Sequence, residues 1–364
     1  MRIGVIASVA HRSPPYNYGP WEQIASTLAE GFVARGHDVT LFATGDSETS
    51  AQLVAAVPSG YEETPGADAK VFEALHNSTA FAHASEFDVF SNHFDFMPLT
   101  YSRLVSTPVV TTVHGFSSPE IVPVYRQFGD IAHYIAISDA DRHPDLRYAD
   151  TIHHGIDVTR FTFRPEPGEY LLFLGRIHPD KGTHLAIEVA RRAGLPLIIA
   201  GVIQDSEYFR TMVEPQTTGT DVDYVGAVDP AQRDILLGGA RALLHLIGFA
   251  EPFGLSVIES MATGTPVIAT PLGSMPEILR HGVTGYLVPD VEAAVEAVAK
   301  VGRLDRSACR ADVDEHFTAD RMTDAYLTVF ERIANSQARS TGATTTAPQP
   351  RSIGSPGLFS HAGM

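Results

Sequence analysis

The stretch Glu251-Pro-Phe-Gly-Leu-Ser-Val-Ile-Glu259 decides the fold class of this 364-residue chain. It follows an apolar run, Ala242–Leu246, with the length of a buried strand, and it enters a helix predicted over Leu255–Thr263. Pro252 favours the start of a helix, and Gly254 lets a ligand come close to the backbone. The unpaired N–H groups of this first helical turn lie at the carboxyl end of the strand, where open α/β sheets bind ligands and where phosphate is favoured. The stretch therefore predicts an α/β fold with an anion site at this turn.

Two carboxylates flank the turn. Glu251 precedes the helix and is placed to accept hydrogen bonds from sugar hydroxyls, and Glu259, about one turn into the helix, is placed to take a ribose diol. The alternative interpretation is a helix-capping glutamate and a surface glutamate. The spacing by itself leaves both interpretations open.

A pair of cations lies in a second segment, Phe173-Leu-Gly-Arg-Ile-His-Pro-Asp-Lys-Gly182. The segment leaves a predicted buried strand, Tyr170–Leu174, so Arg176 and Lys181 emerge together at its carboxyl end. Two cations there suit a diphosphate, because each charge-assisted hydrogen bond contributes roughly 1.5–3 kcal/mol. A pair of solvated loop cations is the alternative.

Apolar runs rich in Val, Ile and Leu alternate with helical segments along most of the chain. Near-continuous apolar runs are typical of strands covered on both faces, so we expect parallel sheets with helices on each side. Helices are expected over Trp21–Arg35, Thr183–Ala193 and Leu255–Thr263, each followed by glycine. The expected strands are Ile3–Val9, Asp38–Ala43, Asp88–Ser91, Val109–Val113, Tyr134–Ile137, Thr151–His153, Tyr170–Leu174, Leu197–Ala200, Val222–Val225, Ala242–Leu246, Pro266–Ala269 and Tyr286–Val288.

These strand–helix units fall into two sets, which predicts two doubly wound α/β domains. The turn-rich segment Arg164–Gly168 marks the boundary, with a first domain over residues 1–160 and a second over residues 165–316. Phe317–Ile333 is expected as a final helix. Residues 335–364, rich in Ser, Thr, Pro, Gly and Ala, are expected to form a disordered tail.

The composition disfavours several classes of function. Lys and Arg total 26 against 43 Asp and Glu, a formal net charge of −17, which disfavours binding to nucleic acid. Residues 1–160 carry 9 Lys and Arg against 19 Asp and Glu, so no strong membrane association is expected. Ile3–Val9 is expected to be a strand rather than part of a signal peptide. The one cysteine, Cys309, excludes an intrachain disulfide and fits a cytoplasmic location.

Two further candidates lie in the first half of the chain. The loop Pro14–Trp21 follows the first strand and contains no G-x-G-x-x-G, which disfavours a nicotinamide dehydrogenase. Gly19 in this loop still allows a phosphate to approach the backbone. His114, which follows the strand Val109–Val113, is placed to hydrogen-bond a substrate hydroxyl, with a structural role as the alternative.

Together and in this order, the motifs resemble the retaining nucleotide-sugar glycosyltransferases of family 4, the glycogen-synthase-like group with the GT-B fold. The resemblance extends over nearly the whole chain, up to about residue 335. Its most specific element is Glu251–Glu259, and Gly175-Arg176…Lys181-Gly182 is the next. Weaker support comes from Ala136–Ser138, His154–Asp157 and Gly285–Pro289.

The resemblance implies two Rossmann-like domains facing each other across an active-site cleft, with the last helix crossing back onto the first domain. It implies that Arg176 and Lys181 hold the donor diphosphate, and that Glu259 holds the ribose. The family works without a bound metal, so neither a metal nor a cofactor is expected.

For the transferred sugar or the distal phosphate, the resemblance implies Glu251 together with the backbone of Phe253, Gly254 and Leu255. It places His114 near the reacting sugar. The first loop departs from the family pattern, in which adjacent glycines are usual, because Gly19 is followed here by Pro20, which has no N–H. One phosphate donor is therefore missing from that loop.

The leading hypothesis is an enzyme that moves a sugar from a nucleoside diphosphate, with UDP favoured over GDP, to a hydroxyl of a small-molecule or glycan acceptor. A nucleotide-sugar epimerase, a glycan phosphorylase and a non-catalytic nucleotide-sugar-binding subunit are the alternatives. A two-carboxylate glycosidase is disfavoured, because its pair faces one scissile bond about 5–10 Å apart, whereas Glu251 and Glu259 bracket a phosphate-type turn.

Overall fold

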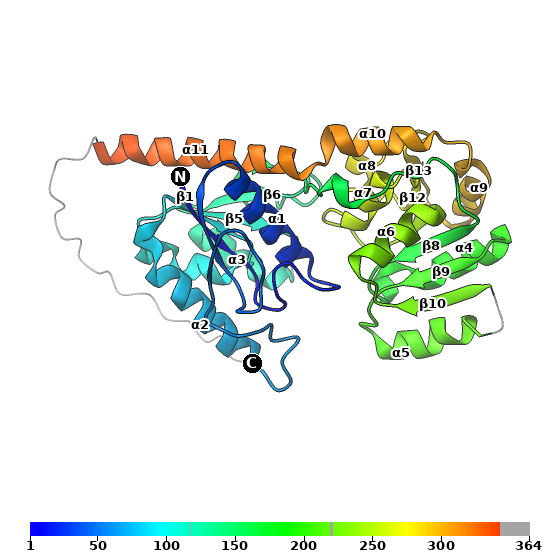
Figure 1. Ribbon diagram of the computed structural model, residues 1–364, viewed down its shortest axis with the longest axis horizontal. Helices are drawn as coiled ribbons and strands as arrows, with labels where there is room; N and C mark the ends of the chain where they lie inside the picture. The colour runs from blue at the N-terminus through cyan, green and yellow to red at the C-terminus, as the bar shows by residue number, and fades with distance from the viewer. Residues whose placement is uncertain (117, 219–220, 343–364) are drawn as a thin grey trace, which may run out of the picture.

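The computed structural model describes residues 1–116, 118–218 and 221–342, with only the helical backbone described for residues 337–342. Two α/β domains lie side by side, and a long C-terminal helix runs from the second domain over the first (Figure 1). Each domain is built on one sheet, and every strand pair in the described residues is parallel. The predicted pair of Rossmann-like domains is confirmed.

The first sheet has seven strands in the order β3-β2-β1-β4-β5-β6-β7. Their bounds are β1 Arg2–Ile6, β2 Asp38–Phe42, β3 Gln52–Val54, β4 Val89–Asn92, β5 Val109–Val113, β6 His133–Ala136 and β7 Tyr148–Thr151. The strand order reverses at β1, beside β4, and a ligand crevice is expected outside the carboxyl ends of the strands at such a point.

The second sheet repeats this order with six strands, β10-β9-β8-β11-β12-β13. Their bounds are β8 Tyr170–Leu174, β9 Leu197–Ala200, β10 Val222–Gly226, β11 Ala240–His245, β12 Val267–Ala269 and β13 Gly285–Leu287. Here the order reverses between β8 and β11, the two strands that carry the motifs of the second domain.

Helices cover both faces of each sheet, which is why the strands are apolar on both sides. The α-helices are α1 Pro20–Ala34, α2 Ala69–Ala82, α3 Val122–Phe128, α4 Thr183–Ala193, α5 Ser206–Tyr208, α6 Pro230–Gly239, α7 Leu255–Ala262, α8 Met275–Ile278, α9 Val291–Val301, α10 Arg306–His316 and α11 Ala319–Gly342. Short helical turns are η1 Ala84–Glu86, η2 Met97–Leu104, η3 Pro119–Ile121, η4 Val158–Arg160, η5 Pro179–Lys181, η6 Phe209–Val213 and η7 Glu214–Gln216.

Each of the twelve expected strands corresponds to an observed one. The predicted Thr151–His153 is displaced, since β7 spans Tyr148–Thr151 at the sheet edge. Strand β3 was not expected, because Gln52–Val54 is three residues long and half-exposed at the opposite edge, too short for an apolar period to show.

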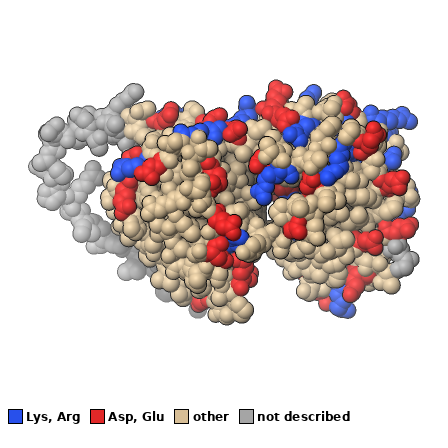
Figure 2. All heavy atoms as spheres, viewed as in Figure 1, with Lys and Arg blue, Asp and Glu red and all other residues tan. Residues whose placement is uncertain are grey.

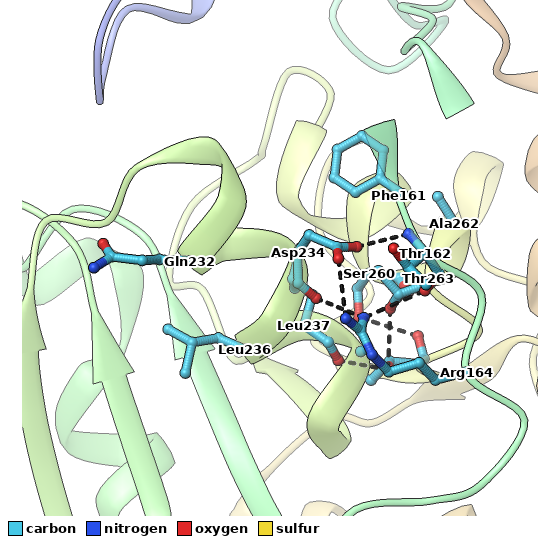
Figure 3. Close-up of polar contacts among 12 residues, drawn as sticks. Phe161, Thr162, Arg164, Gln232, Asp234, Leu236, Leu237, Ser260, Ala262 and Thr263 are labelled. Carbon is cyan, nitrogen blue, oxygen red and sulfur yellow. Dashed lines mark hydrogen bonds and ion pairs between the residues drawn. The ribbon is translucent and has the colours of Figure 1, made fainter. Parts of the chain in front are cut away.

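The segment between the two domains is tied to α6. Asp234 Oδ1 accepts from the main-chain N–H of Thr162 at 2.7 Å, and Asp234 Oδ2 accepts from Arg164 Nη2 at 3.0 Å (Figure 3). Arg164 Nη1 also donates to the main-chain oxygen of Asp234 at 2.9 Å. The interdomain segment and α6 therefore hold one another in place.

Helix α11 completes the core of the first domain (Figure 1). Tyr326 and Phe330 are buried there beside α1, and the ring of Phe330 lies 5.5 Å from that of Phe32. The Tyr326 hydroxyl and Thr112 Oγ1, on β5, are 2.8 Å apart. The helix extends past Asn335, where the tail was expected to begin, and residues 343–364 of that tail lie outside the described residues.

Acidic and basic side chains are interspersed over both domains, and the face drawn in Figure 2 is hollowed between them. Among the described residues, no helix combines the length and apolarity needed to cross a bilayer. Cys309 is buried and unpaired, and burial raises the pKa of its thiol to about 12.

Candidate active site

A cavity of about 280 Å³ lies between the domains, at the carboxyl ends of β1, β8 and β11. It is lined by the β1–α1 loop of the first domain and by the loops after β8, β10 and β11 of the second. The residues to which the sequence assigned roles all line this cavity: Gly19, His114, Arg176, Lys181, Glu251, Phe253, Gly254, Leu255 and Glu259. The structure therefore brings every predicted site residue to one place.

The turn between β11 and α7 is fixed by its neighbours. Gly254, the residue before α7, has φ +97°, and a Cβ there would lie 2.8 Å from Met275 Cε. Ser274 donates from its main-chain N–H to the oxygen of Glu251 at 2.9 Å and from Oγ to the oxygen of Phe253 at 2.7 Å. The N-terminus of α7 is consequently presented to the cavity by a braced turn, in keeping with the predicted anion site.

Lys181 ends the helical turn η5 and reaches across to Glu251. The turn packs closely against the end of β11, because Gly248 N donates to the oxygen of Asp180 at 2.7 Å, and Gly182, at φ +72°, lies where a Cβ would be 2.0 Å from the Leu246 oxygen. Lys181 Nζ then lies 2.5 Å from Glu251 Oε2.

Glu251 is held as a carboxylate. Burial by itself raises the pKa of Glu251, but His245, whose Nε2 lies 3.5 Å from Oε2, and Lys181 outweigh burial and lower the pKa to about 2. An ionised Glu251 accepts hydrogen bonds and has no proton to give at neutral pH. It suits the holding of hydroxyl groups rather than general-acid chemistry.

Arg176 lies in the loop between β8 and η5 and lines the cavity together with Lys181. Its Nη1 donates to Gln204 Oε1. Tyr18, on the first-domain loop, interacts electrostatically with Arg176. Burial raises the pKa of Tyr18, and the positive charge of Arg176 partly offsets that rise. Arg176 thus lies close to a loop of the other domain.

His114 belongs to a row of buried imidazoles. Ser91 Oγ lies 2.9 Å from His93 Nε2, His93 Nδ1 lies 3.1 Å from His114 Nε2, and His114 Nδ1 lies 3.3 Å from His154 Nε2. Burial lowers the pKa of His93 and of His154 to about 3, and burial with these two neighbours holds that of His114 well below its usual value. The row is therefore neutral at physiological pH.

This row restricts what His114 can do. A neutral imidazole has one donor and one acceptor nitrogen, so the bonds along the row all run in one direction. Both ring nitrogens of His114 are engaged by other histidines, and its face stacks on Trp21 with ring centroids 5.6 Å apart. The predicted bond from its imidazole to a sugar hydroxyl, which stays a prediction, requires one of these contacts to open.

Glu259 forms an ion pair with Arg233, a residue that the sequence analysis did not identify. Arg233 Nη1, on α6, donates to Glu259 Oε1 at 3.0 Å and lies 3.4 Å from Oε2. Its Nη2 donates to the main-chain oxygen of Asn17, in the first domain, at 3.0 Å. Nothing in the sequence around Arg233 marks it, because Glu259 and Asn17 are distant along the chain.

The Gly19-Pro20 step has a local reason. Gly19 has φ +150°, and a Cβ there would lie 2.9 Å from both Pro15 Cβ and Glu22 Oε2. Pro20 is the first residue of α1, a position where an N–H has no intrahelical partner and where proline is favoured. Pro20 therefore removes one N–H from the loop, and in the same position it favours the start of α1.

Several other lining residues were not expected. His245 is buried with Nε2 facing Glu251, Trp21 covers His114, and His154 ends the imidazole row. His154 begins the motif His154–Asp157 but had no assigned role, and His245 lay inside the predicted strand Ala242–Leu246 and ends the observed β11. Buried histidines near strand ends were therefore the available signal. Among the described residues no three His, Cys, Asp or Glu side chains form a metal-binding group.

Two family profiles match the chain in succession. Residues 22–160 match glycosyltransferase family 4, and residues 158–311 match glycosyl transferases group 1. The chain belongs to the family 4 glycosyltransferases of the GT-B fold. The first matched segment covers strands β2 to β7 of the first sheet and the second covers all six strands of the second sheet, while β1 and the β1–α1 loop precede both.

Known relatives cover the length of this glycosyltransferase. It is 25% identical to a phosphatidyl-myo-inositol mannosyltransferase of Mycobacterium leprae, over 93% of this chain and 99% of the relative. A solved glycosyltransferase of avilamycin A biosynthesis has a TM-score of 0.72 at 21% identity, covering 92% of this chain and 98% of that one. The Anabaena HepE protein, solved with UDP and glucose, has a TM-score of 0.68 at 18% identity, covering 93% and 100%. These structures confirm the predicted fold.

Proposed function

We propose that this glycosyltransferase moves a sugar from a nucleoside diphosphate to an acceptor hydroxyl with retention of the anomeric configuration. The observation that carries the proposal is the convergence of Arg176, Lys181 and the N-terminus of α7 on one cavity. Two cations and a helix N-terminus suit a diphosphate, and the ionised Glu251 beside them suits sugar hydroxyls. Retention is supported by the family resemblance.

The proposed chemistry is electrostatic. As the bond from the sugar to the diphosphate breaks, negative charge grows on the leaving phosphate oxygen while the sugar becomes oxocarbenium-like. Arg176 and Lys181 stabilise that growing charge more than they stabilise the bound donor, which lowers the barrier. In this proposal the two side chains supply the positive charge, and no metal is required.

For the donor we propose a UDP-sugar in first place and a GDP-sugar in second. The HepE relative was solved with UDP and glucose, and the Mycobacterium leprae relative is a mannosyltransferase. Glu259 lines the same cavity, and its proposed role is to hold the ribose diol. The acceptor is proposed to be a small molecule or a glycan, bound from first-domain loops beside His114, and the enzyme is proposed to act in the cytoplasm.

The test is a thermal-shift screen against UDP, GDP, ADP, TDP and their common sugars, with NAD as the control. A ligand at 100 times its Kd stabilises the native state by about 2.7 kcal/mol, which raises Tm by several degrees. We expect a shift with one nucleoside diphosphate and its sugar, followed by sugar transfer to an added acceptor. A shift with no nucleotide at millimolar concentration contradicts the proposal. Formation of an epimerised sugar in the absence of acceptor would identify an epimerase instead. Formation of sugar 1-phosphate from phosphate and a glycan would identify a phosphorylase.

A further inference from the structure

Arg233 is a cation of the cleft that contacts both domains. It donates to the carboxylate of Glu259 on its own domain and to the main-chain oxygen of Asn17 on the other, both at 3.0 Å. Asn17 lies in the loop that also contains Tyr16, Tyr18 and Gly19, all of which line the cavity. One guanidinium therefore joins the predicted ribose carboxylate to a loop of the other domain.

Helix α6, which carries Arg233, is held in place by its own contacts. Arg233 lies on α6 next to Asp234, whose carboxylate is tied to Thr162 and Arg164 of the interdomain segment (Figure 3). Helix α6 also begins with a capping box, in which Asp229 and Gln232 bond reciprocally. Contacts on both sides of Arg233, the capping box before it and the Asp234 contacts after it, thus fix the position of this part of α6.

Arg233 and Glu259 form a largely buried ion pair in which Glu259 can still accept further hydrogen bonds. The Glu259 side chain is 10% exposed and that of Arg233 is 27% exposed. Two ionised carboxylate oxygens offer about four acceptor sites, and Arg233 reaches both oxygens through one nitrogen, so sites remain for the two hydroxyls of a diol. Arg233 Nε is buried with no partner among the described residues.

From this geometry we propose that Arg233 is a positioning residue for the nucleoside, which orients Glu259 toward a ribose 2′,3′-diol and holds the Asn17 loop over it. The proposal rests on the proposed function, because it presupposes that a nucleoside diphosphate occupies the cavity. It adds a specificity: the site selects ribonucleoside diphosphates over their 2′-deoxy counterparts, and Arg233 is required for that selection.

The physical reason is the number of bonds that the 2′-hydroxyl makes. A carboxylate fixed by Arg233 offers both oxygens to the diol, whereas an unrestrained carboxylate rotates and loses one of the two bonds. A hydrogen bond to a charged group contributes about 10- to 100-fold in affinity. We therefore expect the wild-type enzyme to bind the ribo form about 10- to 100-fold more tightly.

The experiment measures dissociation constants by calorimetry for UDP and 2′-deoxy-UDP, GDP and 2′-deoxy-GDP, and ADP and 2′-deoxy-ADP. In Arg233→Gln we expect the ribo preference to fall to within about 3-fold, because Glu259 loses its charged partner. Arg233→Lys keeps the positive charge, but a lysine ammonium lacks the two separate nitrogens that contact Glu259 and Asn17, so an intermediate ribo preference is expected. Arg280→Gln is the matched control: Arg280 donates to the buried Asp312 at the same 3.0 Å but does not line the cavity, and the wild-type preference is expected there.

A second readout follows the loop itself. Trp21 is the chain's one tryptophan and lies four residues after Asn17. Acrylamide quenching of Trp21 fluorescence is expected to fall when the nucleotide binds to the wild type and to change less in Arg233→Gln, because the loop has lost its tie to α6.

The outcomes separate the two proposals. If the wild type binds no nucleoside diphosphate, the proposed function fails. If it binds ribo and deoxy forms equally, or if Arg233→Gln keeps both the preference and the quenching change, the role of Arg233 is overturned while the proposed function stands. If Arg233→Gln does not fold, Arg233→Lys decides the question by the same ratio.

Discussion

Lys181 and Glu251, 70 positions apart in the chain, form an ion pair in the cleft with Nζ 2.5 Å from Oε2, and each side chain is less than 15% exposed. A buried pair of this kind contributes little net stability, but removal of one partner leaves a charge uncompensated. Each of the two groups has a proposed partner in the substrate, diphosphate for the lysine and sugar for the glutamate. The pair therefore helps to keep Glu251 ionised and holds both side chains in place before a donor arrives.

Replacement of this lysine tests its proposed role. Lys181→Ala is expected to lower kcat by about 10²–10³, because one preformed charge at the leaving diphosphate is lost. It is also expected to cost about 3–5 kcal/mol of unfolding free energy, as Glu251 is left buried without its cation. Steady-state kinetics and urea unfolding measure the two effects. Lys300→Ala is the control, since Lys300 pairs with Glu296 on the surface, and wild-type activity in folded Lys181→Ala would contradict the role.

Arg176 offers a test that is free of a stability effect. Its side chain donates to the neutral Gln204, so removal of Arg176 leaves no carboxylate without its cation. Arg176→Ala is expected to lower kcat by about 10²–10³ with Tm nearly unchanged. Arg210→Ala, which removes an exposed arginine paired with Glu207, is expected to leave both quantities alone. Equal turnover in the two variants would refute the assignment.

Gly182 couples the backbone to the position of Lys181. Gly182→Ala places a Cβ 2.0 Å from the Leu246 oxygen at φ +72°, whereas Gly36→Ala has φ +78° with no atom within 4 Å. The Gly36 variant is expected to lose about 1–2 kcal/mol from the left-handed conformation alone. Gly182→Ala is expected to lose more and to lower kcat by about 10-fold or more, because the turn must move. Equal costs in chemical denaturation and unchanged kcat would show that the turn has room to adjust.

The imidazole row predicts loss of stability in mild acid. The pKa values of His93 and His154, about 3 in the folded chain, lie below the ordinary value of about 6.5 in the unfolded chain. As pH falls below 6.5 the unfolded chain takes up protons that the folded chain refuses, so each histidine lowers the unfolding free energy by up to about 1.4 kcal/mol per pH unit down to about pH 3.

Urea unfolding between pH 7 and pH 5 measures this slope. His93→Phe is expected to reduce it by the share of one histidine, and His83→Asn, which alters an exposed ring, is expected to leave it unchanged. Glu251, with a pKa of about 2, acts in a separate window below about pH 4.5. A stability that stays flat from pH 7 to pH 5 would mean that the row accepts protons in the folded state.

The sequence was informative where local chemistry repeats. Buried strands such as Val109–Val113 and Tyr170–Leu174 were predicted to the residue, because runs covered on both faces have a plain apolar signature. The nine predicted site residues share one cavity, because motifs at the carboxyl ends of parallel strands meet at one edge.

What the sequence could not show were the pairings between distant residues. The contacts of Arg233 with Glu259 and Asn17, and of Lys181 with Glu251, depend on how the two domains and their loops come together. The row of His93, His114 and His154 comes from three different loops, and each histidine alone has an ordinary strand-end context. Strand β3 lies at a sheet edge, where packing rather than apolar period sets the bounds.

The crossing of α11 reverses the order in which the two domains can be finished during synthesis. The first domain is translated first, yet its core includes Tyr326 and Phe330, which follow the whole second domain. At about 5–20 residues per second, a ribosome needs roughly 10–30 s to travel from the interdomain segment to these residues. Until α11 emerges, the core of the first domain is covered by α1 but lacks its α11 side chains, whereas the second domain has all of its own residues as soon as His316 has been added. The half of the chain that is made earlier is therefore the half that becomes native later.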